Sequence, residues 1–189
     1  MRIFLSCLIL ILLLHGYARA QKRATPPARS ASTQQTETYK SVVIDKDGGL
    51  RITTSRNRTI TVPKQGEQVS FRDPRLSPDR TAVGAKAEFG NCCTSYDVAL
   101  ELVVYSRGKL HRFSGEKIPI SRWQFVADRR VVFGQAETHS YCRVHYELRD
   151  IQSERLIDSV DVPAPCAFDP DPKQPTIPKW ASDLIAAQP

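Results

Sequence analysis

Val98-Ala99-Leu100-Glu101-Leu102-Val103-Val104 carries an apolar side chain at every even-numbered position. Residues 143–149 repeat this alternation, with apolar side chains at the even positions and charged or polar ones at the odd positions. Successive side chains of a strand point to opposite faces, so a period of two predicts strands with one face toward a core. Residues 40–162 contain no segment with a convincing helical period, and we predict that they form an all-β domain.

Shorter apolar runs on both sides of these stretches predict further strands. Residues 42–44 and 50–52 flank Asp45-Lys46-Asp47-Gly48-Gly49, whose residue types are typical of a turn. Residues 42–52 are therefore interpreted as an N-terminal β-hairpin. The other candidate strands are Thr59–Val62, Thr81–Ala87, Lys109–Phe113 and Arg130–Gly134.

The predicted domain contains an internal duplication. Residues 76–83 match residues 125–132 at an offset of 49, and Glu101-Leu102 matches Glu147-Leu148 at an offset of 46. Each copy has a turn with Asp-Arg, a short apolar strand, a loop with cysteine, a longer alternating strand, a turn and a last strand. We therefore predict two antiparallel sheets of the same design.

Leu76-Ser77-Pro78-Asp79, followed by a short apolar strand, resembles the repeat of TolB-type β-propellers. In that family a Ser-Pro-Asp-Gly turn leads into a strand of each four-stranded blade. The resemblance covers residues 70–160 as about two blade-like copies. Arg80 and Arg129 stand where the family has Gly, and Ala127 stands where it has Pro. Because a closed propeller needs four or more blades, the resemblance implies two blade-like sheets plus the hairpin, as an incomplete propeller or an open sandwich.

The N-terminus has the features of a secretory signal peptide. Arg2 precedes an apolar run from residue 3 to residue 14, and Ala18-Arg19-Ala20 supplies a cleavage site after Ala20. The apolar run spans about 18 Å as a helix, short of the ~30 Å hydrocarbon core. We expect a secreted or periplasmic protein with no transmembrane span after cleavage.

The amino-acid composition of residues 21–189 indicates a linker, a folded domain and a tail. Residues 21–39 are rich in Ser, Thr, Gln, Ala and Pro and are predicted to be a disordered linker. Residues 40–162 form the β-repeat domain, and residues 163–189 form a proline-rich tail. The tail excludes regular strands, but a helical turn is expected around Trp180 to Ala187, with Trp180 and Leu184 docking it on the domain.

An exported chain with four cysteines after the signal peptide is expected to form disulfides. The candidates are Cys92, Cys93, Cys142 and Cys166, which allow three pairings. A bond between the neighbours Cys92 and Cys93 is strained, so each is expected to pair with Cys142 or Cys166. We interpret these bonds as structural rather than redox-active.

The charge is too modest to predict a nucleic-acid binder. The formal net charge is +7, and residues 21–189 carry +5. Arg51, Arg56, Arg58 and Lys64 concentrate positive charge in the first half of the chain and are candidates for a binding patch. A solvated strand face is the alternative interpretation. For an exported protein, such a patch suits anionic polysaccharide or lipid headgroups.

The sequence contains no catalytic, metal or cofactor motif that we can assign. The common nucleotide, serine-hydrolase and zinc-protease motifs are missing from the sequence, so no catalytic residue is proposed. His139-x-x-Cys142-x-x-His145 is the strongest metal candidate, but on a strand Cys142 points opposite to both histidines. Asp45-Lys46-Asp47-Gly48 begins like a calcium loop without the later ligands. We expect neither metal nor cofactor.

We predict an exported, non-enzymatic interaction module of the TolB-like repeat type. It would bind an envelope or extracellular protein, or itself, through strand edges or a loop face. The alternative is a hydrolase or carbohydrate-active enzyme with its site in the loops Phe89–Tyr96 and Gln135–Cys142. A purely structural protein is a third possibility. The residues that would test the enzyme hypothesis are Asp79, Asp128, His139 and His145.

Overall fold

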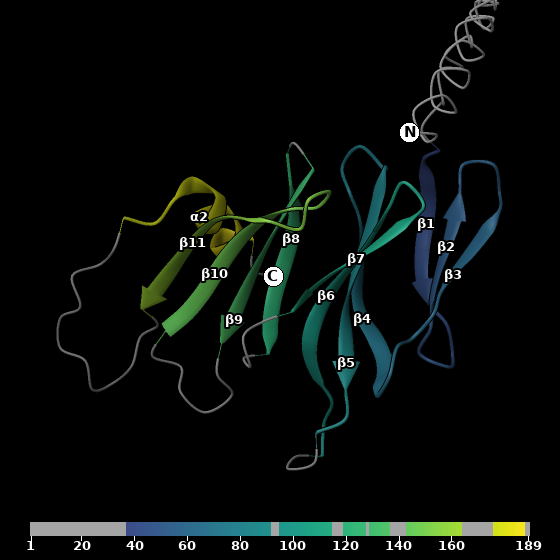
Figure 1. Ribbon diagram of the computed structural model, residues 1–189, viewed down its shortest axis with the longest axis horizontal. Helices are drawn as coiled ribbons and strands as arrows, with labels where there is room; N and C mark the ends of the chain where they lie inside the picture. The colour runs from purple at the N-terminus through teal and green to yellow at the C-terminus, as the bar shows by residue number, and fades with distance from the viewer. Residues whose placement is uncertain are drawn as a thin grey trace, which may run out of the picture. The chain divides into compact units, whose positions relative to one another are not determined.

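The described part of the chain folds into three antiparallel sheets and one short helix (Figure 1). These elements belong to the unit that spans Gln35–Pro189. The sheets do not close into a barrel, so the prediction of an open, all-β arrangement is confirmed. The structure describes residues 37–91, 95–114, 119–127, 129–136, 143–163 and 176–187.

Each sheet is a meander, in which strands that follow one another in the chain lie side by side. The first sheet contains β1 (Tyr39–Ile44), β2 (Leu50–Thr54) and β3 (Thr59–Val62). The second sheet contains β4 (Gln68–Leu76), β5 (Ala82–Phe89), β6 (Val98–Ser106) and β7 (Lys109–Ser114). The third sheet contains β8 (Ile120–Val126), β9 (Arg130–Ala136), β10 (Arg143–Asp150) and β11 (Leu156–Pro163).

The predicted hairpin of residues 42–52 is part of the three-stranded first sheet. β2 pairs with β1 on one side and with β3 on the other. The turn between β1 and β2 is held by Asp45, whose Oδ1 accepts the backbone N–H groups of Asp47 and Gly49 at 3.0 and 2.8 Å. β1 begins at Tyr39, the last residue of the predicted linker.

The second and third sheets have the same strand order, as the duplication predicts. The apolar strand, the long alternating strand and the last strand of each copy are present as β5, β6 and β7 and as β9, β10 and β11. Each copy also begins with a strand that is missing from the predicted set, β4 in the first and β8 in the second. Each repeat is therefore a four-stranded sheet.

Bulges explain why alternation does not reveal β4 and β8. In β4 the register shifts between Arg72 and Arg75, around Asp73, whose φ is 54°. In β8 the register shifts between Ile120 and Arg122. A bulge places two residues opposite one, so the period of two is lost at that point.

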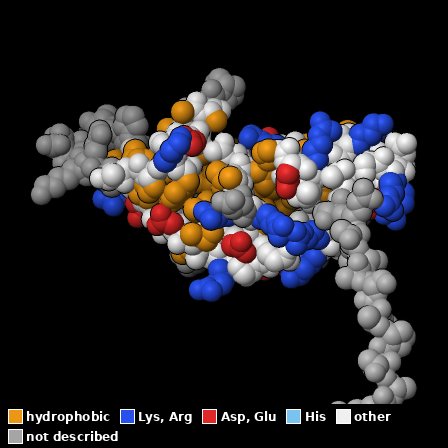
Figure 2. Space-filling model, turned by 90° about the horizontal axis from the view of Figure 1, so that it is seen from above, with side chains coloured by type: hydrophobic (Ala, Val, Ile, Leu, Met, Phe, Trp, Pro, Cys, Tyr) orange, Lys and Arg blue, Asp and Glu red, His pale blue; other side chains and the backbone are white. Residues whose placement is uncertain are grey.

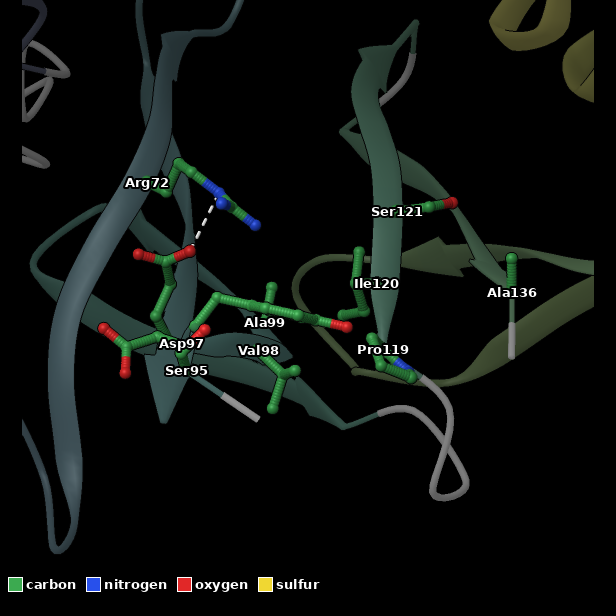
Figure 3. A pocket seen from close by; sticks show the side chains of 11 residues that line it. Arg72, Ser95, Asp97, Val98, Ala99, Pro119, Ile120, Ser121 and Ala136 are labelled. Atoms are coloured by element: carbon green, nitrogen blue, oxygen red, sulfur yellow. Dashed lines mark ion pairs between the residues drawn. The ribbon is translucent and has the colours of Figure 1, made fainter. Parts of the chain in front are cut away.

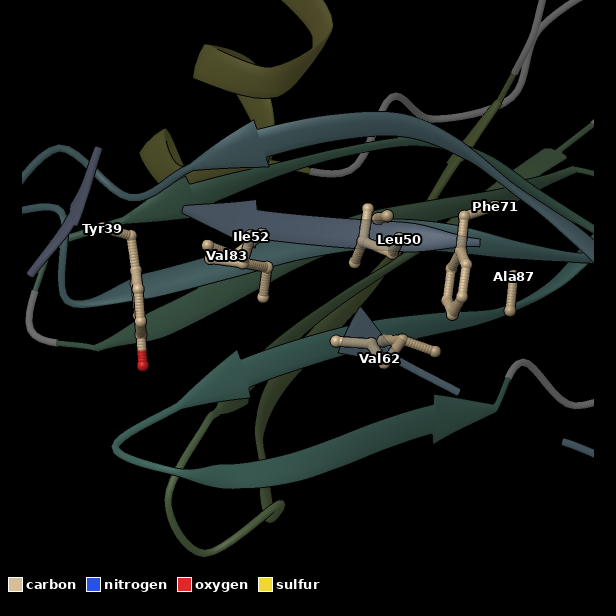
Figure 4. Packing of buried hydrophobic residues seen from close by; sticks show 9 residues of the cluster. Tyr39, Leu50, Ile52, Val62, Phe71, Val83 and Ala87 are labelled. Atoms are coloured by element: carbon tan, nitrogen blue, oxygen red, sulfur yellow. The ribbon is translucent and has the colours of Figure 1, made fainter. Parts of the chain in front are cut away.

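Three apolar clusters hold the sheets and the helix together. The first cluster joins the first and second sheets and contains Leu50, Phe71 and Val83 (Figure 4). The second cluster joins the second and third sheets, and the third joins the third sheet and the helix. Val83 of β5 belongs to the first cluster and its neighbour Ala82 to the second, so both faces of the second sheet are covered.

The second and third sheets approach each other closely at Gly84, within β5. A Cβ atom at this position would lie 2.5 Å from Cη2 and 2.8 Å from Cζ3 of Trp123 in β8. Trp123 is fully buried, and its ring forms a T-shaped pair with the ring of Phe125, with the centroids 5.1 Å apart. Glycine leaves the space that the indole fills, so Gly84 permits the observed spacing of the two sheets.

The expected helical turn is present as α2 (Lys179–Ala186). Ala181 and Leu184 are buried against a cluster that includes Val132 and Tyr146 of the third sheet. Trp180 Nε1 donates a hydrogen bond to Asp158 Oδ2 of β11 at 3.0 Å. An eight-residue helix is marginal in isolation, so α2 depends on this contact with the sheet.

The two Asp-Arg turns place an arginine in a backbone conformation that favours glycine. Arg80 has φ 57° and Arg129 has φ 61°. The left-handed region is unfavourable for a residue with a Cβ atom, by about 1 kcal/mol. We therefore expect Arg80→Gly and Arg129→Gly each to raise the free energy of unfolding, measured with urea, by about 0.5–1 kcal/mol.

Arg56→Gly is the matched control, because Arg56 is also an exposed turn arginine but is not among the described residues with positive φ. Glycine at this position should leave stability unchanged or lower it by a few tenths of a kcal/mol. A loss of stability in Arg80→Gly and Arg129→Gly would contradict the turn geometry.

Candidate functional site

A cleft of about 620 Å³ lies between the second and third sheets (Figure 3). The second sheet and the residues just before β6 supply charged and polar side chains, and β8 and its approach supply an apolar wall. The cleft adjoins the described ends of both loops that the sequence singles out, since Tyr96 and Ala136 line it. The lining residues are Arg72, Glu88, Ser95, Tyr96, Asp97, Val98, Ala99, Pro119, Ile120, Ser121 and Ala136.

The charged centre of this cleft is the pair formed by Glu88 and Arg72. Arg72 Nε lies 2.8 Å from Glu88 Oε1, and the Ser70 hydroxyl donates a hydrogen bond of 2.7 Å to Glu88 Oε2. The Glu88 side chain is 10% exposed, whereas that of Arg72 is 56% exposed. Glu88 is not singled out by sequence reasoning. The β4–β5 register places Ser70 opposite Glu88. Sequence reasoning could have found this pair only if β4 had been predicted as a strand.

Lys86, two residues before Glu88 on the same face of β5, links the two sheets. Lys86 Nζ donates a hydrogen bond of 3.2 Å to the Ser121 carbonyl oxygen in β8 and lies 3.9 Å from Asp73 Oδ2. Burial lowers the pKa of Lys86, and the nearby Asp73 carboxylate opposes that effect. The second and third sheets therefore meet through a buried charge as well as through apolar side chains.

A second candidate is the free edge of β11, which pairs with β10 alone among the described strands. The side chains of Leu156 and Ile157 are 48% and 46% exposed. Asp158 accepts the hydrogen bond from Trp180, and Asp161 Oδ1 lies 2.8 Å from His145 Nδ1. The two acidic side chains of β11 are thus engaged by neighbours within the same molecule.

The structure does not bring the predicted basic patch together at one place. Arg51 lies in β2 and is 3.6 Å from Asp45, and Lys64 donates hydrogen bonds to backbone carbonyls near the same end of the sheet. Arg56 and Arg58 lie beyond the other end of β2, where Arg58 pairs with Glu37. Figure 2 shows Lys and Arg side chains spread over the face seen from above, with acidic side chains among them. All four residues are exposed.

His145, predicted to face outward from a strand, is half-buried between two carboxylates. Its Nδ1 contacts Asp161, and its Nε2 lies 3.5 Å from Glu147 Oε1. Glu147 is 3% exposed and accepts hydrogen bonds from Gln135 Nε2 at 2.9 Å and Arg149 Nε at 2.7 Å. Alternation marks these residues as the polar face of β10, but that face is partly covered.

Asp79, the described member of the two repeat aspartates, caps its own turn. Its Oδ1 accepts the Ser77 hydroxyl at 2.6 Å and the Thr81 backbone N–H at 3.1 Å, and its Oδ2 accepts the Thr81 hydroxyl at 2.7 Å. Burial raises the pKa of Asp79, but these hydrogen bonds outweigh that effect and hold the pKa below its usual value. The turn role expected from the repeat is therefore present.

Asp79→Ala is expected to lower the free energy of unfolding by about 1 kcal/mol at pH 7, because three hydrogen bonds to an ionised but exposed group are lost. Because the pKa of Asp79 is lower in the folded protein than in the unfolded chain, the ionised carboxylate stabilises the fold at pH values above the unfolded pKa. This stabilisation is lost as the pH falls through the pKa of the folded protein. The difference from the parent should therefore shrink between pH 7 and pH 3 in urea unfolding. A difference for Asp79→Ala that stayed constant with pH would contradict the cap.

The remaining predicted positions lie outside the described residues. They are Cys92, Cys93, Cys142, Cys166, Asp128 and His139. Within the described ranges, no group of three or more His, Cys, Asp or Glu side chains is arranged to hold a metal ion.

Comparison with known proteins adds no family to this description. The chain matches no family model, and no curated protein is significantly similar to it. In the part of the chain that the structure describes, no helix is long and apolar enough to cross a membrane.

Proposed function

We propose that this chain is an exported interaction module of the TolB-like propeller-repeat type, which binds an envelope or extracellular protein through the free edge of β11. Two observations support the repeat type. Both copies are four-stranded meanders, and Arg80 and Arg129 have positive φ where the family has glycine. The signal-peptide features of residues 1–20 support export.

The open edge of β11 is the observation that carries the proposal. An exposed edge strand offers unpaired N–H and C=O groups to another chain, and proteins usually protect it with bulges, prolines, charges or short length. β11 has eight residues, its proline is the last of them, and it contains no lysine or arginine. Its one register shift lies near its start, beside Arg149 and Leu156.

The other described edges are better protected. β4 is interrupted by the bulge at Asp73 and Pro74, and β7 carries Lys109 and Arg112. β1 has a bulge after Tyr39, and β3 has only four residues. β8, the other edge of the third sheet, has a register shift after Ile120 and carries Arg122. β11 is thus the edge most suited to strand addition, with its exposed apolar pair beside the incoming chain.

Site-specific photocrosslinking in the producing cells tests this proposal. A photoreactive residue at Ile157 or Ser159 should yield one discrete adduct with a second, exported protein. The same residue at Ile177, which is an exposed isoleucine outside the strands, should not yield it. Ser159→Pro in the Ile157-labelled chain should weaken the adduct because proline disrupts an edge for pairing.

Three results would overturn the proposal. They are equal adducts from Ile157 and Ile177, no adduct from β11, and an adduct that contains only a second copy of this chain. The last result would mean that β11 mediates self-association.

The enzyme alternative is favoured by one observation, the cleft that Tyr96 and Ala136 line at the described ends of the two loops that the sequence singles out. Its charged residue Glu88 is tied to Arg72 and Ser70, and Asp79 and His145 are engaged in the contacts described above. Asp79 and His145 are the two described residues among those that would test the enzyme hypothesis, and these contacts give both of them structural roles. A turnover that Glu88→Gln abolished in a folded protein would favour the alternative.

A further inference from the structure

Five of the strand connections lie together at one end of the stack of sheets. They are residues 55–58, 77–81, 107–108, 127–129 and 151–155. The Ser55 backbone N–H donates to the Thr38 carbonyl oxygen at 2.8 Å, and the residue after Thr38 donates its N–H to the Arg80 carbonyl oxygen at 2.8 Å. These bonds join the first sheet to the second at this end. A small cavity lined by residues of the β4–β5, β8–β9 and β10–β11 turns and by Ser106, at the end of β6, joins the second sheet to the third.

The turns at this end are rich in arginine. Their described residues include six exposed arginines and two acids, and Asp128, outside the described residues, is a third acid in this part of the sequence. The arginines are Arg56, Arg58, Arg80, Arg107, Arg129 and Arg155. The described residues of the opposite connections, 45–49, 63–67 and 95–97, include two lysines and four acids. Positive charge is therefore concentrated at the end with the six arginines, which we call the arginine end. Figure 2 looks onto this end from above and shows more Lys and Arg than Asp and Glu side chains there.

Most of the guanidinium groups at the arginine end are free to meet a ligand. Four of the six form no side-chain hydrogen bond or ion pair in the described part of the chain. The four are Arg56, Arg107, Arg129 and Arg155. The two described acids, in contrast, are engaged within the molecule. Asp79 caps its own turn, and Glu154 Oε1 lies 2.9 Å from His111 Nδ1.

Three of the arginines occupy backbone positions that favour glycine. Arg80, Arg107 and Arg129 have φ values of 57°, 52° and 61°. The left-handed region costs a residue with a Cβ atom about 1 kcal/mol, and glycine avoids this cost. The stability of the turns therefore does not explain the arginine side chains, which points to a role outside the fold.

The arginines form a two-dimensional array, because their turns come from all three sheets. Turns separated by two strands within a sheet lie about 10 Å apart, and stacked sheets also lie about 10 Å apart. A single polyanionic chain would follow one line through such an array, whereas an anionic surface meets all of it. Among the described residues the exposed aromatic side chain is Tyr96, in the opposite connections, so the arginine end offers none for packing against a sugar ring.

We infer that the arginine end docks on the anionic headgroups of a lipid membrane. The chain enters the domain at this end, because Thr38 is bonded to the β2–β3 turn, and residues 21–36 add three basic residues and no acid. Of the basic patch expected from the sequence, only Arg56 and Arg58 belong to this surface. The docking does not depend on the protein partner proposed for β11.

Co-sedimentation of the residue 21–189 chain with lipid vesicles tests this inference. The chain should bind vesicles of phosphatidylglycerol and phosphatidylcholine mixed in a one-to-two ratio, and it should not bind vesicles of phosphatidylcholine alone. Raising NaCl from about 0.05 M to about 0.5 M should release the chain, because salt shortens the range of the attraction. Soluble alginate, at the same concentration of negative charge, should bind more weakly than the anionic vesicles.

Combining Arg80→Gly, Arg107→Gly and Arg129→Gly in one chain separates binding from folding. A basic residue near an anionic membrane surface contributes about fivefold to binding, so this triple variant should bind the anionic vesicles about 100-fold more weakly. Its free energy of unfolding should stay the same or rise, because glycine suits the left-handed backbone. A loss of binding could then not be attributed to a loss of structure.

Combining Lys46→Gln, Arg51→Gln and Arg143→Gln gives the control variant. It removes the same charge from exposed positions at or near the opposite end of the strands. Its binding to the anionic vesicles should change by less than about threefold, since salt screens charges more than about 10 Å from the membrane.

Five results would overturn the inference. They are equal binding to both kinds of vesicle, no binding to the anionic vesicles, an unchanged affinity in the arginine variant, an equal loss in the control variant, and tighter binding to alginate than to the vesicles. The last result would assign the arginine end to an anionic polysaccharide. If the triple variant fails to fold, Arg107→Gly alone, with its expected fivefold loss, decides the question.

Discussion

Gly84→Ala is expected to lower the free energy of unfolding by about 1–3 kcal/mol, and Gly84→Val by more. The added Cβ would meet Trp123 Cη2 at 2.5 Å, closer than side-chain atoms approach, and the indole is fully buried between the sheets. Overpacking of this kind forces side chains from their preferred rotamers or moves the backbone. Urea unfolding followed by tryptophan fluorescence measures the effect.

Gly90→Ala is the matched control for this experiment. A Cβ atom at Gly90 meets nothing within 4 Å, so stability should change by less than about 0.5 kcal/mol. Trp123→Leu should itself destabilise, but it should also reduce the penalty of Gly84→Ala when the two are combined. Additive effects in that cycle would show that the two residues do not touch.

Leu184→Ala is expected to lower the free energy of unfolding by about 2–4 kcal/mol. Leu184 is 3% exposed, and it packs with Val132, Tyr146 and Leu148 on the face of the third sheet that α2 covers. Removing a buried leucine side chain loses its transfer free energy and leaves a cavity. The effect should appear in the same unfolding transition as the sheets, because α2 has little stability without them.

Asp183→Ala tests an exposed position of the same helix. Asp183 is paired with Lys179 at 2.9 Å, but both side chains are largely exposed, and such pairs contribute about 0.3–0.5 kcal/mol. A small change for Asp183→Ala beside a large one for Leu184→Ala would identify packing, not charge, as the origin of docking. Similarly small changes for Asp183→Ala and Leu184→Ala would contradict the conclusion that packing docks α2 on the sheet.

Local pattern predicts the elements whose environment is regular. Alternation correctly predicts β6 and β10 as strands, because apolar residues recur at every second position of each. In β6, however, a register shift against β5 leaves Leu100 exposed and buries Ala99, so not every even-numbered side chain faces a core. The turn at Asp79 follows from the repeat, since a short acidic side chain there hydrogen-bonds the backbone close by. These features depend on residues within one repeat.

Features that depend on contacts between repeats could not be predicted in this way. The polar face of β10 looks solvent-exposed in the sequence, yet Glu147 is buried. Nothing within β5 requires glycine at position 84. The requirement comes from the close approach of Trp123, which lies in another sheet. The cleft likewise combines Arg72 and Glu88 of the second sheet with Ile120 of the third. Alternation within one strand carries no information about the sheet that covers it.

The solution mass of residues 21–189, measured by light scattering under non-reducing conditions, tests the central claim most directly. The claim is that this chain is an open stack of sheets whose last face is covered by its own helix α2, leaving the β11 edge for a different protein. The predicted result is the mass of a single chain at micromolar concentration. A stable dimer or a larger ring would contradict it, because the sheets would then be completed by copies of the same chain.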